Sequence, residues 1–237
     1  MTYCVAALAS SGIVFASDSR TNAGTAEVAT YGKMTVFENS GDRIVVLLTA
    51  GNLATSQGVV QLLNGRRDAL MAKANLYDTA ALVGETLREV MARDAQALRQ
   101  ANVDPSASFI VGGQVRGETP RLFMVYPQGN FIEATRETNY FQLGETRYAK
   151  PLLELVLHPE VALDDAAKCV LLAMEGTMRF DIAVGAPVDV LAYEKDSLRV
   201  TRRRRFEEDD PQLAELGELW KRGMGELCAR APALRWH

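Results

Sequence analysis

The first eighteen residues constrain the fold more than any other part of the chain. Residues 3–9 are apolar, residues 10–12 (Ser-Ser-Gly) can turn the chain, and residues 13–16 form a second apolar run. Two apolar runs joined by a short turn are typical of a β-hairpin. Because side chains alternate between the faces of a strand, residues 2, 4 and 6 should share one face and residues 3, 5 and 7 the other.

Thr2 gives this hairpin the groups of an activated nucleophile. Met1 precedes a small residue, and a methionine in that position is normally removed in the cytosol, which would make Thr2 the first residue. A terminal threonine carries a hydroxyl and a primary amine whose unperturbed pKa of about 7.7–8.0 suits a general base at neutral pH. Asp18 ends the second strand, which runs back towards Thr2, so we expect the two residues to lie close together.

The composition favours a globular protein that holds no metal or cofactor. The 237 residues, 48% of them hydrophobic, suit one domain over residues 1–237, and the net charge of −4 argues against nucleic acid as the main partner. Three cysteines and two histidines are too few for a disulfide framework, a zinc site or a histidine-based triad. No apolar run approaches the ~20 residues that a membrane helix needs, and no signal peptide is recognisable. We therefore expect a cytoplasmic protein with no membrane contact.

Periodicity predicts blocks of strands alternating with groups of helices. Apolar runs bounded by turn residues predict strands, and apolar residues at a spacing of three to four predict helices. The polar residues 19–24 are predicted to form a loop. Strands are predicted over residues 28–31, 33–37, 44–50, 108–113, 121–126, 130–134, 140–143, 188–194 and 198–204, and helices over residues 53–63, 79–100, 148–157, 164–179 and about 210–230.

The order of these elements predicts the fold class. Helices that come in pairs between blocks of strands argue against a doubly wound parallel sheet. An α+β fold fits better, with two packed antiparallel sheets, a helix pair on each outer face and a C-terminal helix over residues of about 210–230.

Four segments, taken in order, resemble a proteasome β-subunit. They are Thr2 at the start, Asp18-Ser19-Arg20 after the second strand, Lys33 at the start of the next strand, and Thr49-Ala50-Gly51 before a helix. More narrowly, three segments resemble the bacterial Anbu, or ancestral β-subunit, group: the start Met-Thr-Tyr-Cys, Gly51-Asn-Leu-Ala-Thr-Ser56 and Val184-Gly-Ala-Pro-Val-Asp-Val-Leu-Ala-Tyr-Glu194. Together these motifs extend over nearly the whole chain.

This resemblance implies the four-layer αββα sandwich of the N-terminal nucleophile hydrolases. It also implies hydrolysis of an amide bond through an acyl-enzyme, in which the Thr2 hydroxyl attacks and the Thr2 amine moves the proton. Lys33 matches the lysine whose charge lowers the pKa of the nucleophile, and Asp18 matches the carboxylate that pairs with this lysine. Gly51 matches the residue whose N–H stabilises the oxyanion, a contact typically worth roughly 3 kcal/mol.

The resemblance also implies a substrate site. Asn22, Gly51 and Leu53 match positions where the family uses main chain to pair with an extended peptide, a form of β-augmentation.

Two parts of the family pattern are altered. Asp181 matches a family aspartate of the catalytic centre, but Ala183 and Val184 stand where the pattern has a serine that helps to hold the terminal amine. A second serine-containing segment is replaced by residues 143–146, Leu-Gly-Glu-Thr, in which Glu145 or Thr146 is a candidate replacement.

Two further features have structural explanations. Cys4 shares a face with Thr2, but it is not terminal and has no histidine partner, so a buried thiol is expected. Residues 202–205 are four consecutive arginines, which a strand would divide between its two faces, and acidic residues follow over 207–210. A solvated edge or a subunit contact therefore explains these arginines better than a nucleic-acid site does.

The combined expectation is a cytoplasmic threonine-type peptidase that acts on peptides or unfolded proteins and self-associates into a ring or ring-like homo-oligomer. Two alternatives are an N-terminal nucleophile amidase acting on a small molecule, and a scaffold subunit whose site has decayed, which the missing serine allows. The sequence does not indicate whether an ATPase partner exists. Because the sequence begins with Met1, we expect a form that retains it, in which the Thr2 nitrogen is an amide and cannot act as a base.

Overall fold

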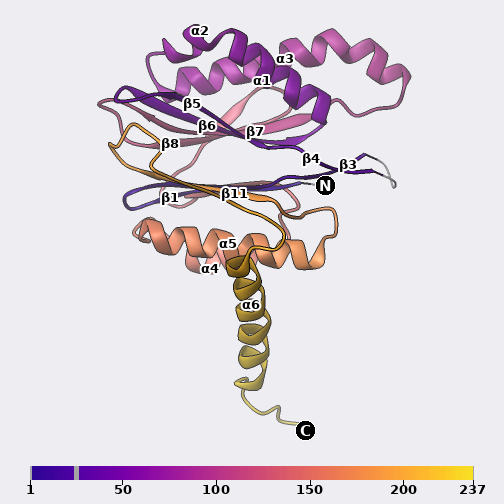
Figure 1. Cartoon of the computed structure of the whole chain (residues 1–237), viewed down its shortest axis with the longest axis vertical. Coiled ribbons are helices and arrows are strands. Elements are labelled where there is room, and N and C mark those ends of the chain that lie inside the picture. The colour runs from indigo at the N-terminus through magenta and orange to yellow at the C-terminus, as the bar shows by residue number, and fades with distance from the viewer. Residues whose placement is uncertain (1, 24–26, 237) are drawn as a thin grey trace.

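The computed structural model describes the backbone of residues 2–23 and 27–236, and the side chains of all of these except residues 22, 23, 27 and 28. Two five-stranded antiparallel sheets pack face to face, and helices cover both outer surfaces (Figure 1). The α+β class and the four αββα layers are therefore as the sequence predicts.

The first sheet is built on the N-terminal hairpin. β1 (Tyr3–Ala9) and β2 (Gly12–Asp18) lie at its centre and pair antiparallel. β10 (Tyr140–Gly144) pairs with the free side of β1, while β11 (Val188–Glu194) and then β12 (Arg202–Phe206) continue the sheet beyond β2.

The second sheet has the order β5-β6-β7-β8-β9. Its strands are β5 (Met34–Asn39), β6 (Arg43–Gly51), β7 (Ala107–Val115), β8 (Arg121–Val125) and β9 (Phe131–Glu133). A separate two-stranded ribbon, β3 (Arg20–Ala23) and β4 (Glu27–Thr30), projects from the side of the sandwich where β1 begins (Figure 1).

Helices form the outer layers. α1 (Leu53–Gly65), α2 (Arg67–Met71) and α3 (Leu76–Gln100) cover the second sheet, and α4 (Lys150–Val156) and α5 (Leu163–Phe180) cover the first (Figure 1). α6 (Pro211–Ala229) starts against α5 and then extends away from the body. Its residues from 221 onwards are all exposed, whereas Leu213 and Gly217 are buried.

Three apolar clusters separate the four layers. Side chains of β1 alternate as the sequence predicts, because Cys4 and Ala6 pack in the cluster between the sheets and Tyr3, Val5 and Ala7 pack against α4 and α5. β6 is buried on both faces, which explains why its sequence is almost continuously apolar. Burial of both faces fixes the register, since a shift by one residue would exchange the two sets of side chains.

The turn from β6 into α1 ends in a helix cap. The Asn52 side chain accepts a hydrogen bond from the Thr55 N–H at 3.1 Å, which satisfies one of the free donors of the first helical turn. This cap fixes the direction in which the chain leaves β6, and therefore the position of Gly51 at the end of that strand.

Two predictions about local structure are wrong, and one helix was missed. Residues 20–23, predicted as loop, form β3. Their sequence lacks apolar alternation, but antiparallel pairing with β4 satisfies the hydrogen-bonding groups of their backbone. α2 was not predicted. The last strand begins at Arg202 rather than Leu198, because Asp196 and Leu198 adopt positive φ angles and lengthen the turn after β11.

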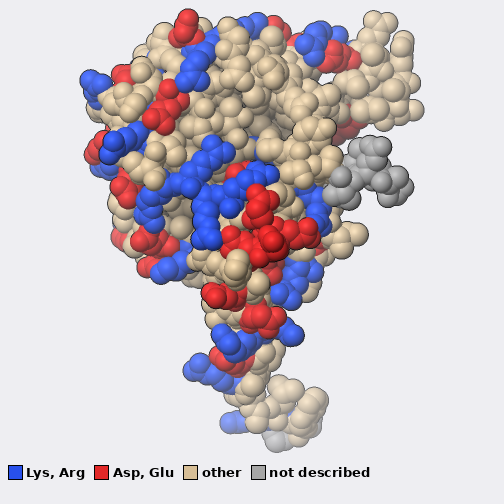
Figure 2. Space-filling model, in the orientation of Figure 1, with Lys and Arg blue, Asp and Glu red and all other residues tan. Residues whose placement is uncertain are grey.

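The arginines of β12 divide between the two faces of the strand. Arg203 and Arg205 both approach the Asp189 carboxylate, whereas Arg202 pairs with Asp164 and Arg204 with Asp210. Basic and acidic side chains accordingly lie side by side on the face in Figure 2. Each arginine has an acidic partner within the chain, and β12 is an exposed edge strand, which is consistent with either predicted alternative, a solvated edge or a subunit contact. No helix in the described part of the chain has the length and apolarity needed to span a bilayer.

Candidate active site

A buried ion pair lies where the first sheet meets the β3–β4 ribbon. Asp18 ends β2, Lys33 directly precedes β5, and the Lys33 Nζ lies 2.6 Å from the Asp18 Oδ1. The Asp18 side chain is 0% exposed and the Lys33 side chain is 6% exposed. Lys33 also donates to the Arg20 carbonyl oxygen at 2.6 Å, so its ammonium bridges a carboxylate and a main-chain oxygen.

The pair is attached to the start of the chain. The N–H of Tyr3 donates to Asp18 Oδ1 at 3.0 Å, and the N–H of Gly185 donates to Asp18 Oδ2 at 3.4 Å. Burial raises the pKa of Asp18, while the Lys33 ammonium and the two N–H groups act in the opposite direction. Because Thr2 immediately precedes Tyr3, the pair lies beside the backbone of the predicted nucleophile.

Thr2 is held on its other side by the end of β10. The N–H of Glu145 donates to the Thr2 carbonyl oxygen at 2.8 Å. Gly144, with φ of +82°, lies so close that a Cβ there would be 1.8 Å from that oxygen. Only glycine permits both the backbone angle and the approach. The structure therefore places Glu145, rather than Thr146, in backbone contact with Thr2.

The Glu145 carboxylate does not replace a serine hydroxyl. It is buried, and it accepts hydrogen bonds from the main-chain N–H and the guanidinium of Arg147. These bonds hold the pKa of Glu145 below its usual value. A carboxylate that is already paired in this way supports the loop that follows β10.

Gly51 lies at the corner where β6 turns into α1. Its φ is +105°, and a Cβ would lie 2.4 Å from the Ser106 carbonyl oxygen. This position therefore requires glycine, because the backbone angle and the close approach of β7 both exclude a side chain. Leu53, the other substrate residue predicted here, is the first residue of α1.

A cavity of about 240 Å³ opens beside Lys33. It is lined mainly by β5, β6 and α1, and most of its lining side chains are polar but uncharged. They include Thr35, Thr49, Ser56 and Gln57, with Leu53 on one wall. The cavity adjoins the ion pair, and its volume can hold one side chain of an extended substrate.

Asp181 is near this centre but serves a turn. It directly follows α5, and its Oδ1 accepts the N–H of Ala183 at 2.8 Å. Val184 is buried in the apolar cluster beneath the first sheet, and Gly185 then reaches Asp18. Asp181 and Asp18 are thus the acceptors at the two ends of the 181–185 loop, whose residues Asp-Ile-Ala-Val-Gly include no hydroxyl.

One other predicted feature, Cys4, has a clear outcome in the structure, and two lie outside its description. The Cys4 Sγ donates to the Thr49 carbonyl oxygen at 3.5 Å, and burial raises the pKa of this thiol, so Cys4 is a buried core thiol as predicted. Asn22 lies in β3, but its side chain is outside the described residues. Met1 also lies outside them, so the expectation that it is retained is not settled by the structure.

The site thus brings together Thr2, Asp18 and Lys33, with Gly51 and Leu53 at the adjoining corner. No group of three or more acidic, histidine or cysteine side chains that could hold a metal ion is found among the described residues. Sequence reasoning missed Arg20, Gly144 and Gly185, which act through main-chain atoms. The positive φ required at Gly144 was the one available signal, since glycine followed a predicted strand there.

Comparison with known proteins gives a consistent result. The sequence model of the family described as proteasome subunit matches residues 2–192. Among curated proteins, the chain is 25% identical over 189 residues to proteasome subunit beta 2 of Pyrobaculum calidifontis, covering 79% of this chain and 86% of that protein.

Solved structures are more similar. Anbu (ancestral beta-subunit) from Yersinia bercovieri superposes with a TM-score of 0.93 at 43% identity, covering 99% of both chains. A structure described as the helical assembly of the Anbu complex from Pseudomonas aeruginosa has a TM-score of 0.91 at 44% identity and covers 98% of both chains.

Proposed function

Since the chain belongs to the proteasome subunit family, and within it to the Anbu group, we propose that it is a threonine-type peptidase that hydrolyses peptide amide bonds through an acyl-enzyme on Thr2. The proposed substrate is a peptide or an unfolded protein segment in extended conformation. The active form has lost Met1, so that the nitrogen of Thr2 is a free amine.

One observation carries this proposal: the buried Asp18–Lys33 pair, fixed to the N–H of Tyr3, lies beside the backbone of Thr2. A buried positive charge next to a hydroxyl and an amine favours their deprotonated forms. Burial also strengthens this effect, because the charge is little screened by water.

Each step of the proposed reaction has a candidate group in the chain. The Thr2 hydroxyl attacks the substrate carbonyl, and the Thr2 amine accepts its proton and later passes it to the leaving nitrogen. The N–H of Gly51 stabilises the oxyanion, and the polar cavity beside Lys33 receives the side chain that precedes the scissile bond. Water then hydrolyses the ester and regenerates Thr2.

A second candidate is a scaffold subunit that has lost catalysis. It is supported by Val184, an apolar residue buried where the family pattern has a serine, and by the pairing of Glu145 with Arg147. Both features leave the terminal amine with fewer hydrogen-bond partners than the family pattern provides.

We also propose that the protein is cytoplasmic and self-associates into a ring or ring-like assembly of identical subunits. This rests on family membership and on the helical assembly described for the Pseudomonas aeruginosa relative. A closed or helical arrangement would restrict the cleft to unfolded chains.

Covalent trapping tests the peptidase directly. Protein lacking Met1 is incubated with a peptide epoxyketone, which reacts with both the hydroxyl and the amine of a terminal threonine, and the adduct is located by peptide mass spectrometry. We expect modification of Thr2 and turnover of at least one member of a peptide library. Thr2→Ala should abolish both, whereas Thr35→Ala, which removes a hydroxyl from the adjoining cavity, should still be labelled. Absence of labelling in the wild-type protein would favour the scaffold.

A further inference from the structure

Arg20 contacts the Asp18–Lys33 pair through its main chain. It is the first residue of β3, two positions after Asp18, and its carbonyl oxygen accepts the Lys33 Nζ at 2.6 Å. Lys33 therefore has two acceptors, and the second one can move only when the backbone at Arg20 moves.

The Arg20 guanidinium reaches the opposite side of the same pair. Its Nη1 donates to the Ile182 carbonyl oxygen at 3.1 Å. It also packs against Gly185 so closely that a Cβ at Gly185 would lie 2.3 Å from the Arg20 Cζ. Gly185 in turn donates its N–H to Asp18. One side chain thus holds the loop that contacts the carboxylate, while the carbonyl of the same residue contacts the ammonium.

We propose that Arg20 is a positioning residue for the Asp18–Lys33 pair, holding the 182–185 loop with its guanidinium and Lys33 with its carbonyl. The proposal rests on the proposed function, because the pair matters for catalysis only if it activates Thr2. Arg20 does not act on the substrate.

Arg20 also joins the site to the segment that leads into α6. Its Nη2 lies 3.7 Å from the Glu208 Oε1, and Glu208 lies beyond the 2–192 region that the family model matches. The Glu208 side chain is 83% exposed, so this ion pair is weak. The contacts with Ile182 and Gly185 are therefore the ones that position the pair, and Glu208 adds only a small bias.

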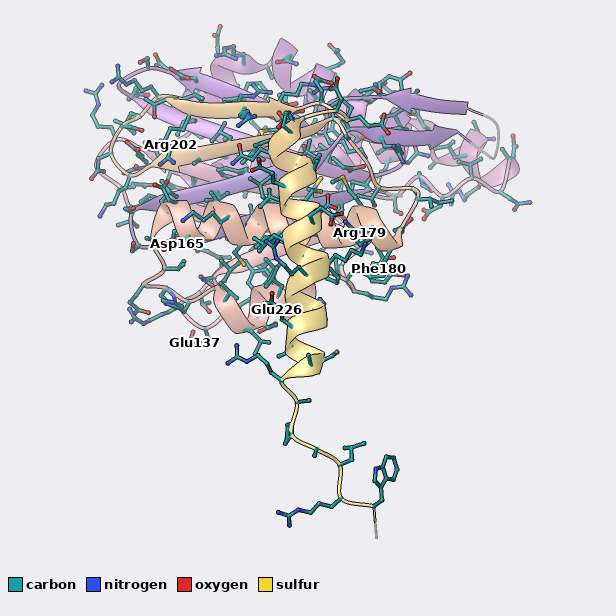
Figure 3. All side chains as sticks on the ribbon, turned by 60° about the horizontal axis from the view of Figure 1, so that its bottom comes forward. Glu137, Asp165, Arg179, Phe180, Arg202 and Glu226 are labelled. Carbon is teal, nitrogen blue, oxygen red and sulfur yellow. The ribbon has the colours of Figure 1, made fainter. Side chains whose placement is uncertain are left out.

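A cavity of about 400 Å³ next to Arg20 supplies a matched control. Its lining includes Arg179, whose guanidinium bonds Glu175 and the Gly217 carbonyl oxygen and has no contact with Asp18 or Lys33. Figure 3 shows Arg179 and Phe180 at the end of α5, beside α6. Arg179→Met removes an arginine from the same cavity without removing a contact to the 182–185 loop.

The first test measures the rate at which the epoxyketone labels Thr2 as a function of pH. If the Lys33 ammonium moves away from Thr2, the pKa of the Thr2 amine rises. Arg20→Met should therefore slow labelling about tenfold and move the midpoint of the pH–rate curve to higher pH. The other groups that face Lys33 are Asp18 and the Cys4 thiol, which burial keeps neutral. Arg20→Lys, which can still reach the Ile182 carbonyl, should recover part of the rate. Arg179→Met should leave the midpoint in place.

A double-variant cycle separates positioning from general loss of structure. Gly185→Ala should slow labelling because its methyl group displaces the guanidinium. In an Arg20→Ala background that methyl group has space, so the second change should add little. Independent, multiplicative losses, or an Arg20→Met variant with an unshifted midpoint, would overturn the proposal. Glu208→Gln should change the rate by about twofold at most.

A crystallographic comparison distinguishes failure of this inference from failure of the proposed function. If the wild-type protein is not labelled, the peptidase proposal fails, but the structures of wild type and Arg20→Met still test positioning. We expect the contact between the Gly185 nitrogen and Asp18 Oδ2 to be lost in the variant and Lys33 to shift. Unchanged contacts in a folded variant would show that Arg20 does not position the pair.

Discussion

Asp18 and Lys33 are the residues whose environment explains most about the site. Each is buried, and each is compensated mainly by the other. Removing one partner leaves a charge in the interior, which typically costs roughly 3–5 kcal/mol of stability, whereas removing both leaves no charge to compensate. Substitutions in this pair should therefore affect the stability of the fold and, under the proposed function, the reactivity of Thr2.

For the pair we predict that Lys33→Met and Asp18→Asn each slow Thr2 labelling at least a hundredfold and lower the free energy of unfolding. The double variant should be labelled little more slowly than Lys33→Met alone, because the two residues act as a unit, and it should be more stable than that single variant. Labelling kinetics and urea unfolding measure the two quantities. The exposed pair Asp165–Lys168 is the control, and its removal should change neither. Multiplicative kinetic losses would mean that the two residues act separately.

Glu145 and Arg147 give a pH-dependent prediction. Hydrogen bonds from Arg147 lower the pKa of Glu145 in the folded protein. Its stabilising contribution is therefore present above the unfolded pKa of about 4.3 and is lost as the pH falls through the lower folded value. Arg147→Met should thus destabilise the protein at pH 7 and make progressively less difference towards pH 3. Urea unfolding at both pH values checks this, and an equal difference at both would contradict it.

The sequence predicts the residues of the site better than it predicts their supports. Asp18 and Lys33 carry charge at strand ends, a pattern visible in a linear sequence. Arg20 contributes a carbonyl and Gly185 an N–H, and such main-chain groups do not single out a residue in a sequence. The Arg20 guanidinium reaches the carbonyl of a residue 162 positions away, and spacing along the chain does not indicate that contact. Asp181 was predicted as a catalytic residue from its family position, yet its carboxylate accepts a local main-chain N–H. That hydrogen bond depends on the conformation of the 181–185 loop, which the spacing of residues in the sequence does not determine.

At the scale of elements, the corner between β6 and α1 contains backbone that tolerates no side chain. Gly51 and Gly117 both have positive φ angles, but a Cβ at Gly51 would meet the Ser106 carbonyl oxygen and the Ala107 Cα, whereas a Cβ at Gly117 would meet nothing within 4 Å. Alanine substitutions at the two glycines therefore separate the free-energy cost of the backbone angle from that of a steric clash.

We predict that Gly117→Ala lowers the free energy of unfolding by only about 1–2 kcal/mol, the cost of the backbone angle. Gly51→Ala should cost more, because β6 and β7 must also move apart, and it should abolish Thr2 labelling at temperatures where the protein remains folded. Circular dichroism during urea unfolding and mass spectrometry of the adduct measure both effects. Equal destabilisation by the two substitutions would show that the clash at Gly51 is relieved at no cost.

The elements themselves were predictable wherever a continuous apolar run bounded by turn residues marks a strand. β1, β2, β6 and β11 are buried on both faces, and their boundaries follow from composition. β3 was not predictable in this way, because it is a polar segment that becomes a strand through its antiparallel pairing with β4. Pairing of two polar strands leaves no hydrophobic periodicity in the sequence.

At the scale of the whole molecule, α6 extends away from the sandwich, and much of it contacts no other part of the described chain (Figure 1). Apolar side chains along it, among them Leu219, Met224 and Leu227, are exposed. Exposed apolar surface of this kind is commonly an interaction surface. We therefore predict self-association. Sedimentation at micromolar concentration and physiological salt should show species larger than the 25.9 kDa protomer. A single species of protomer mass would count against an enclosed peptidase.

The central claim is that the free amine of Thr2 is the general base of the site beside Asp18 and Lys33. It is tested most directly by comparing epoxyketone labelling of protein that retains Met1 with labelling of the same protein after treatment with methionine aminopeptidase. Intact-mass measurement establishes the processing state of each sample. While Met1 is present, the nitrogen of Thr2 is an amide and cannot accept a proton near neutral pH. We predict that only the treated protein is labelled at Thr2; equal labelling of both samples would contradict the mechanism.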